Sequence, residues 1–247
     1  MSKKTTNHLA SCNNTINGCI EVPGDKSITH RAIIISSIAD GKTQINRYLN
    51  SKDINATIDA CRQIDAEIEE NNKTLIIKGN NLERIESKDI ELNFGNSGTS
   101  MRLMMGVLSA QKFSSTLVGD ESLNQRPMNR VTNPLVKMNA NIKSSNGTAP
   151  IYISPVNEIR NVDQIVNIAS AQIKSSIMLA GLYGRNTFSI TTPQSRDHTE
   201  IMLNEFGCNI TLESKSIRVI PNKLTSPDKI DIPGDISSAA FFIVGSI

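Results

Sequence analysis

The sequence predicts an α/β (α+β) domain built from three β-α-β-α-β-β units around a pseudo-threefold axis, with buried helices inside and sheets outside. Two repeated features predict this fold. A polar turn of small residues that leads at once into an apolar helix occurs three times. A strand isoleucine also recurs at matching places, at Ile68, Ile142 and Ile210, 74 and then 68 positions apart. Such periodicity indicates one supersecondary unit used repeatedly. An ordinary α/β sheet with coincidental spacing is the alternative.

Each unit opens on an apolar helix with hydrophobic runs such as Ile33, Ile34 and Ile35. A helix that is apolar on nearly all faces is a buried one. We therefore expect these helices to form the centre of the domain. The expected helices are 28–38, 101–108 and 173–182, after turns at 24–27, 95–99 and 170–172.

The rest of each unit follows in a constant order: a β-rich strand, a second polar turn that opens a second helix, and two closing strands. Pro127 suits the first position of a helix because its missing N–H costs nothing there. Asp197 with Glu200 forms the pattern of a capping box. The expected first strands are 43–49, 115–118 and 187–191; the second turns are 51–53, 124–127 and 195–197; the closing strands are 67–68 with 74–77, 141–142 with 151–153, and 209–211 with 217–220.

Composition excludes several functional classes. The 247 residues have a net charge of +2 and no Trp, whereas nucleic-acid binders usually combine a basic excess with aromatic platforms. The apolar runs are shorter than the ~18 residues of a membrane helix, and no apolar stretch follows Lys3 and Lys4 as in a signal peptide. The four cysteines show no C-x-x-C spacing. We therefore expect no metal, no cofactor, no nucleic-acid or membrane partner, and reduced thiols in the cytoplasm.

Cations stand near the start of each expected buried helix: Lys26 and Arg31 in the first unit, Arg102 in the second and Lys174 in the third. A cation opposes the helix dipole there, and a bound anion would resolve that conflict. Each residue alone fits a solvated surface group, and the small polar residues beside them fit helix caps. Recurrence in three units favours anion sites that converge at one end of the domain.

Five stretches of the chain closely resemble the EPSP synthase family, the last two resembling its class II branch. The resemblance extends over about 15–247 and implies the inside-out α/β barrel of the enolpyruvyl transferases. It also implies transfer of the enolpyruvyl group of phosphoenolpyruvate to the 5-hydroxyl of shikimate 3-phosphate, giving 5-enolpyruvylshikimate 3-phosphate and phosphate. The stretches are 22–32 (VPGDKSITHRA), 95–102 (GNSGTSMR), 119–128 (GDESLNQRPM), 170–175 (SAQIKS) and 195–200 (SRDHTE).

Carried over by position, the resemblance implies a shikimate 3-phosphate site. Ser27 and Arg31 hold the carboxylate end of this substrate. Ser170, Gln172 and Arg196 hold the rest, the first and last of them at its phosphate.

The resemblance also implies a phosphoenolpyruvate site at Gly98 and Arg126, with Lys26 between both substrates as the catalytic residue. Ala171 stands where many family members have a second serine. A contact at that position therefore has to come from the backbone.

The resemblance further implies that family chains are much longer, with a second domain that supplies the general acid and base. We expect the substrate-binding domain at 22–232. Residues 1–21 and 233–247 are expected to belong to the second domain, with a strand at 16–22 and an apolar helix at 236–247. The expected partner is that second domain, the full-length protein is expected to be a monomer, and the 247 residues alone are expected to be inactive.

Three other functions have less support from the sequence. The sister family that transfers enolpyruvyl to a UDP-sugar lacks the Lys-Ser-x-x-x-Arg arrangement and has a loop cysteine, whereas this chain has no Cys between Cys61 and Cys208. A phosphate-handling enzyme of similar repeat fold, such as an RNA-end cyclase, would need a catalytic His signature and a basic face. A stand-alone anion-binding module remains open.

Overall fold

The computed structural model of the chain describes residues 18–85, 89–213 and 215–245. Its helices are α1 (Lys26–Ile38), α2 (Lys52–Arg62), α3 (Gly98–Leu108), α4 (Glu121–Asn124), α5 (Asn129–Lys137), α6 (Ala171–Gly181), α7 (His198–Glu205) and α8 (Ile236–Gly245). Its strands are β1 (Lys42–Asn46), β2 (Glu67–Asn71), β3 (Thr74–Lys78), β4 (Ile90–Asn93), β5 (Ser115–Val118), β6 (Asn141–Ser145), β7 (Thr148–Ser154), β8 (Gln164–Ile165), β9 (Phe188–Thr191), β10 (Asn209–Glu213), β11 (Ser216–Ile220) and β12 (Lys229–Asp231).

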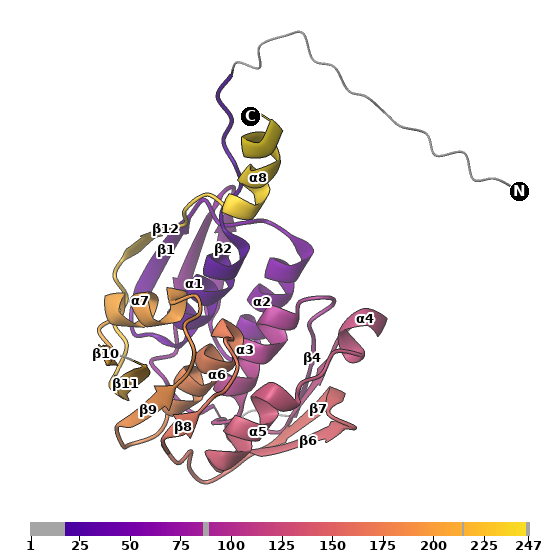
Figure 1. Ribbon diagram of the computed structural model, residues 1–247, viewed down its shortest axis with the longest axis vertical. Helices are drawn as coiled ribbons and strands as arrows, with labels where there is room; N and C mark the ends of the chain where they lie inside the picture. The colour runs from indigo at the N-terminus through magenta and orange to yellow at the C-terminus, as the bar shows by residue number, and fades with distance from the viewer. Residues whose placement is uncertain (1–17, 86–88, 214, 246–247) are drawn as a thin grey trace, which may run out of the picture.

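Three separate four-stranded sheets surround the central helices (Figure 1), with strand orders β12-β1-β3-β2, β4-β5-β7-β6 and β8-β9-β11-β10. In each sheet the first pair of strands is parallel and the other pairs are antiparallel. The three-unit fold is therefore confirmed. The matched isoleucines pair alike: Ile68 opposes Ile77, Ile142 opposes Ile153, and Ile210 opposes Val219.

The first sheet is completed by a strand from the far end of the domain. β12 pairs in parallel with β1, and Ile232 N–H donates to the Asn46 carbonyl at 3.1 Å. The strand expected at 16–22 is not formed in its described part, 18–22. Positions 16 and 17 lie outside the described residues.

The first helix of each unit is buried, as predicted: α1, α3 and α6 bury almost every residue between them. α3 and α6 approach closely at Gly106, where an added Cβ would lie 2.3 Å from the Ser176 carbonyl oxygen. Only glycine allows this approach, which brings the starts of α3 and α6 near each other.

Two details of the second helices differ from the sequence prediction. α5 begins at Asn129, so Pro127 precedes the helix and does not open it. The capping box is not formed: the Asp197 side chain makes no cap at the start of α7, and the Glu200 carboxylate bonds Lys174 on α6. A buried ammonium is a stronger partner for a carboxylate than a backbone N–H, and it draws Glu200 away from the capping role.

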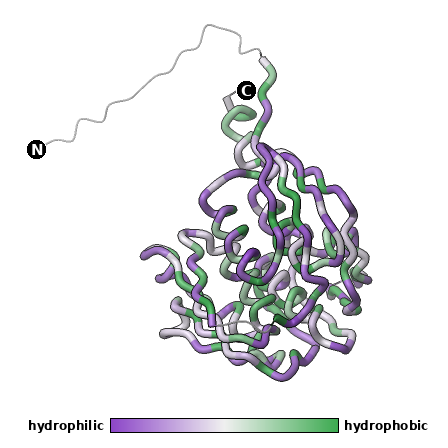
Figure 2. The backbone as a smooth tube through the Cα atoms, turned by 180° about the vertical axis from the view of Figure 1, so that it is seen from behind, coloured by the Kyte–Doolittle hydropathy of each residue, from purple (hydrophilic) through white to green (hydrophobic). Residues whose placement is uncertain are grey.

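α8 extends from one end of the domain beside residues 18–23 and is largely hydrophobic (Figures 1 and 2). None of its residues is buried, and Phe241 is 84% exposed. The helix expected at 236–247 is confirmed over its described residues. None of the helices in the described part of the chain has the length and apolar character needed to cross a bilayer.

Candidate active site

The N-termini of α1, α3 and α6 have no acidic residue in their first turns. Their caps are Asp25, Ser97 and Ser170, which accept hydrogen bonds from backbone N–H groups three residues later. The caps of α1 and α3 are thus Asp25 and Ser97. Ser27 and Thr99 do not cap these helices, so their hydroxyls are available for other contacts.

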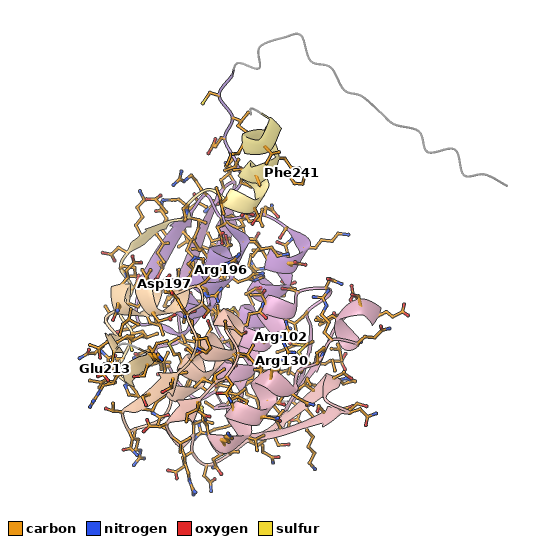
Figure 3. The ribbon with its side chains drawn as sticks, in the orientation of Figure 1. Arg102, Arg130, Arg196, Asp197, Glu213 and Phe241 are labelled. Carbon is orange, nitrogen blue, oxygen red and sulfur yellow. The ribbon has the colours of Figure 1, made fainter. Side chains whose placement is uncertain are left out.

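The first cluster of predicted residues joins α1 to the turn before α7. Arg196 Nη1 donates to Ser27 Oγ at 3.4 Å, although the two residues are 169 positions apart. Arg196 is exposed and so presents its charge to solvent at this point. Figure 3 labels it beside Asp197 on the face seen in Figure 1.

Arg31 lies beneath this cluster and is 3% exposed. Its guanidinium donates to Thr199 Oγ1 at 2.7 Å, to the Ser27 carbonyl at 2.9 Å and to Ser175 Oγ at 3.1 Å. Burial lowers the pKa of Arg31 to about 10, and the nearby Glu200 carboxylate opposes that shift. Three of its five N–H groups thus donate to protein acceptors, which fixes the guanidinium as a buried positive charge beneath the cluster.

The second cluster surrounds Gly98 at the start of α3. An added Cβ there would lie 3.2 Å from Nη1 of Arg102 and 3.2 Å from Nη1 of Arg126. Arg126 also donates to Asn96 Oδ1 at 2.5 Å. Two guanidinium groups therefore converge over a glycine and a helix N-terminus, the arrangement that backbone N–H groups and cations offer to an anion.

Gln172 joins the start of α6 to the second cluster. Its Oε1 accepts from Arg102 Nη1 at 2.9 Å, and its Nε2 donates to Thr99 Oγ1 at 2.9 Å. Gln172 follows Ser170 and Ala171 in the first turn of α6. The predicted residues of the third unit are thereby held against the predicted anion site of the second.

Lys26 opens α1 and forms an ion pair with Asp53 in the first turn of α2. Below it, His30 Nδ1 lies 2.7 Å from Thr57 Oγ1, which donates to Ser100 Oγ at 2.8 Å. Burial and then the charge of Lys26 lower the pKa of His30 to about 3, so the His30 ring is uncharged beneath Lys26 at neutral pH. No described hydrogen bond or ion pair joins Lys26 to the two arginine clusters.

Sequence reasoning missed three features. Asp53 fits a first-turn acid but pairs with Lys26. Lys174 forms a buried ion pair with Glu200 and does not face an anion site. Arg130, at the start of α5, belongs to none of the predicted motifs, and only its position in a helix's first turn could have drawn attention to it.

A cavity of about 800 Å³ opens between the third sheet and the Lys174–Glu200 pair, lined by residues such as Ile165, Thr191 and Ile217. None of the residues that the resemblance assigns to the two substrates lines it, whereas Lys174, expected at an anion site, does. Within the described residues no group of His, Cys, Asp and Glu has the arrangement of a metal site.

The fold and these clusters define a pseudo-threefold domain with guanidinium groups gathered at its helix N-termini. The chain belongs to the EPSP synthase (3-phosphoshikimate 1-carboxyvinyltransferase) family, whose model matches residues 11–247.

Individual relatives agree with this assignment. A 3-phosphoshikimate 1-carboxyvinyltransferase of Endomicrobium trichonymphae is 43% identical over 237 residues, which are 95% of this chain and 55% of the relative. An EPSP synthase structure from Acinetobacter baumannii superposes with a TM-score of 0.86 at 42% identity, over 92% of this chain and 52% of that one. An enolpyruvyl transferase from Streptomyces tendae shares the fold, with a TM-score of 0.71 at 12% identity over 94% and 55% of the two chains. The chain thus spans about half the length of the curated relatives it matches.

Proposed function

We propose that this chain forms the half of an enolpyruvyl transferase active site that binds shikimate 3-phosphate and part of phosphoenolpyruvate. The observation that supports this most is the pair of cationic clusters, one at Ser27–Arg196 and one at Gly98, with Gln172 of α6 held against the second. Each substrate brings a phosphate and a carboxylate, and only grouped cations and helix N-termini would hold so much negative charge together.

Shikimate 3-phosphate lies at the first cluster in this proposal. Ser170 and Arg196 hold its phosphate, Ser27 and Arg31 hold its carboxylate end, and Gln172 contacts the ring. Because Arg31 is already held by three protein acceptors, it contributes preorganised charge and its remaining N–H groups. A cation fixed before the ligand arrives costs no reorganisation on binding.

Phosphoenolpyruvate lies over Gly98, where the absence of a side chain leaves room between Arg102 and Arg126. The 5-hydroxyl loses its proton to a base and attacks C2 of phosphoenolpyruvate while C3 takes up a proton. Loss of a proton from C3 then expels phosphate from C2 and restores the double bond. Lys26 stands between the substrates and stabilises the charge that develops on the addition intermediate. Its ion pair with Asp53 holds the ammonium in place until an anion competes for it.

The rest of the family's length supplies the remaining groups in this proposal. Residues 22–232 form the substrate-binding domain, and residues 1–21 with 233–247 belong to a second domain that closes on it. That domain provides the general acid and base, so the chain alone binds without turnover. The proposed full protein is a monomer, and the unpaired Cys19, Cys61 and Cys208 suit the cytoplasm.

A calorimetric titration of shikimate 3-phosphate into the chain tests the proposal. Arg196→Ala should weaken binding about tenfold, since a charge-assisted hydrogen bond contributes roughly 1.5–3 kcal/mol and this one is exposed. Arg218→Ala, an exposed arginine on β11, is the matched control and should change little. Equal affinities for both variants would place the ligand elsewhere.

A stand-alone anion-binding module is the second candidate, because the cationic clusters at Ser27–Arg196 and at Gly98 would explain anion binding without any turnover. Phosphate release with the full-length gene product separates the two. An enzyme releases phosphate from the two substrates together, whereas a module binds them without release.

A further inference from the structure

Arg130 lies in the first turn of α5, which contains no acidic residue and has no side-chain cap. The residue is exposed. Its side chain forms no hydrogen bond or ion pair with the described residues. A cation at this place opposes the helix dipole without compensation from the protein. Its position therefore needs a reason outside α5.

The reason lies in the neighbouring arginines. Burial lowers the pKa of Arg102, and the positive charges of Arg126 and then Arg130 lower it further. Figure 3 shows Arg102 and Arg130 next to each other, from α3 and α5. Arg102 and Arg126 converge at Gly98. Arg130 lies beside Arg102, whose Nη2 donates to the Pro127 carbonyl just before α5.

The acid Asp120 acts on the Arg126 side of the region around Gly98. Asp120 accepts from Asn96 Nδ2 at 2.8 Å and from the Leu123 N–H at 2.8 Å, and these hydrogen bonds lower its pKa. Asn96 in turn accepts from Arg126. Asp120 is therefore tied to the Arg126 side of the region. Arg102 donates only to Gln172 and to the Pro127 carbonyl in the described contacts, which are neutral groups.

We propose that Arg130 is the third cationic residue of the anion site at Gly98 and gives this site a preference for doubly charged phosphate. This inference rests on the proposed function and deepens it, since phosphoenolpyruvate is the ligand expected there. Arg102 and Arg126 flank the glycine, and two such cations already match a singly charged phosphate and a carboxylate. A third cation at the edge adds attraction for the second phosphate charge.

Titration of phosphoenolpyruvate, with shikimate 3-phosphate present at saturation, tests the inference. Arg130→Gln should weaken binding about five- to tenfold, as expected for an exposed charge. Arg126→Gln should weaken it about thirtyfold. Lys137→Gln is the matched control: it removes the same charge from the exposed C-terminal end of the same helix and should change affinity less than twofold.

The pH dependence separates a charge contact from a structural effect. The second pKa of a phosphate ester is about 6, so lowering the pH from 7.5 to 5.5 converts most of the ligand to the singly charged form. Affinity should fall several-fold for the wild-type chain and less for Arg130→Gln. Arg130→Lys keeps the charge and should recover most of the loss, which tests the idea even if the glutamine variant folds poorly.

Two results would overturn different parts of the account. If Arg130→Gln behaves like Lys137→Gln while Arg126→Gln loses binding, the role of Arg130 is wrong and the proposed function stands. If Arg126→Gln also binds normally, the phosphoenolpyruvate site itself is misplaced.

Discussion

Acidification should destabilise the domain through His30, which lies fully buried beneath Lys26. The folded-state pKa of about 3 lies well below the value of about 6.5 expected in the unfolded chain. At pH values between these two pKa values, His30 binds a proton in the unfolded chain but not in the folded domain. The stability linked to His30 is therefore complete above pH 6.5 and is lost progressively as the pH falls toward 3.

The size of the effect follows from the same shift. One proton difference gives a slope of at most about 1.4 kcal/mol per pH unit. Between pH 7 and pH 4.5 this amounts to about 2 to 3 kcal/mol of unfolding free energy. The groups that face His30 are Lys26 and Arg31, which disfavour its protonation, and Asp53, which favours it.

Urea denaturation at several pH values, on the wild-type chain and on His30→Gln, measures this contribution. Carboxylates elsewhere affect both proteins equally, so the difference between the two curves isolates the histidine. The variant should lose about 2 to 3 kcal/mol less than the wild type over this range. His198→Gln, which removes a half-buried histidine, is the control and should change the slope less. Parallel curves for the wild type and His30→Gln would refute the reasoning.

Three further predictions concern packing and charge. Gly106→Ala places a Cβ 2.3 Å from a carbonyl oxygen of α6 and should lower the unfolding free energy by about 1–3 kcal/mol; an unchanged melting curve would mean that the helices separate freely. Glu200→Gln leaves the Lys174 charge buried without its partner and should cost about 3–5 kcal/mol in denaturation, most of it recovered when Lys174→Met is added. Asp53→Asn frees Lys26 from its ion pair and should tighten binding of inorganic phosphate a few-fold by calorimetry, whereas weaker binding would show that the carboxylate positions the lysine.

Local patterns in the sequence predicted most of the fold. Apolar runs such as Ile33–Ile35 mark buried helices wherever they occur, and the predicted bounds of α1, α3 and α6 differ from the observed ones by only a few residues. The three-residue strand β12 was not foreseen, because its pairing with β1 depends on a contact between distant parts of the chain. Short strands acquire their identity from such partners and have little signal of their own.

The family resemblance supplied candidate members of the site but not the contacts between them. It implied that Ser27, Arg196 and Gln172 belong to one site, and the structure brings Ser27 to Arg196. That Gln172 is held by Arg102 depends on two helices crossing at a glycine. The burial of Arg31 likewise arises from tertiary packing, which no spacing rule in the sequence describes.

A crystal structure of the chain soaked with shikimate 3-phosphate and phosphoenolpyruvate tests the central claim most directly. The account predicts the phosphate of shikimate 3-phosphate between Ser170 and Arg196, and phosphoenolpyruvate over Gly98 between Arg102 and Arg126. Density for either ligand in the 800 Å³ cavity beside the third sheet, with the helix N-termini empty, would contradict it.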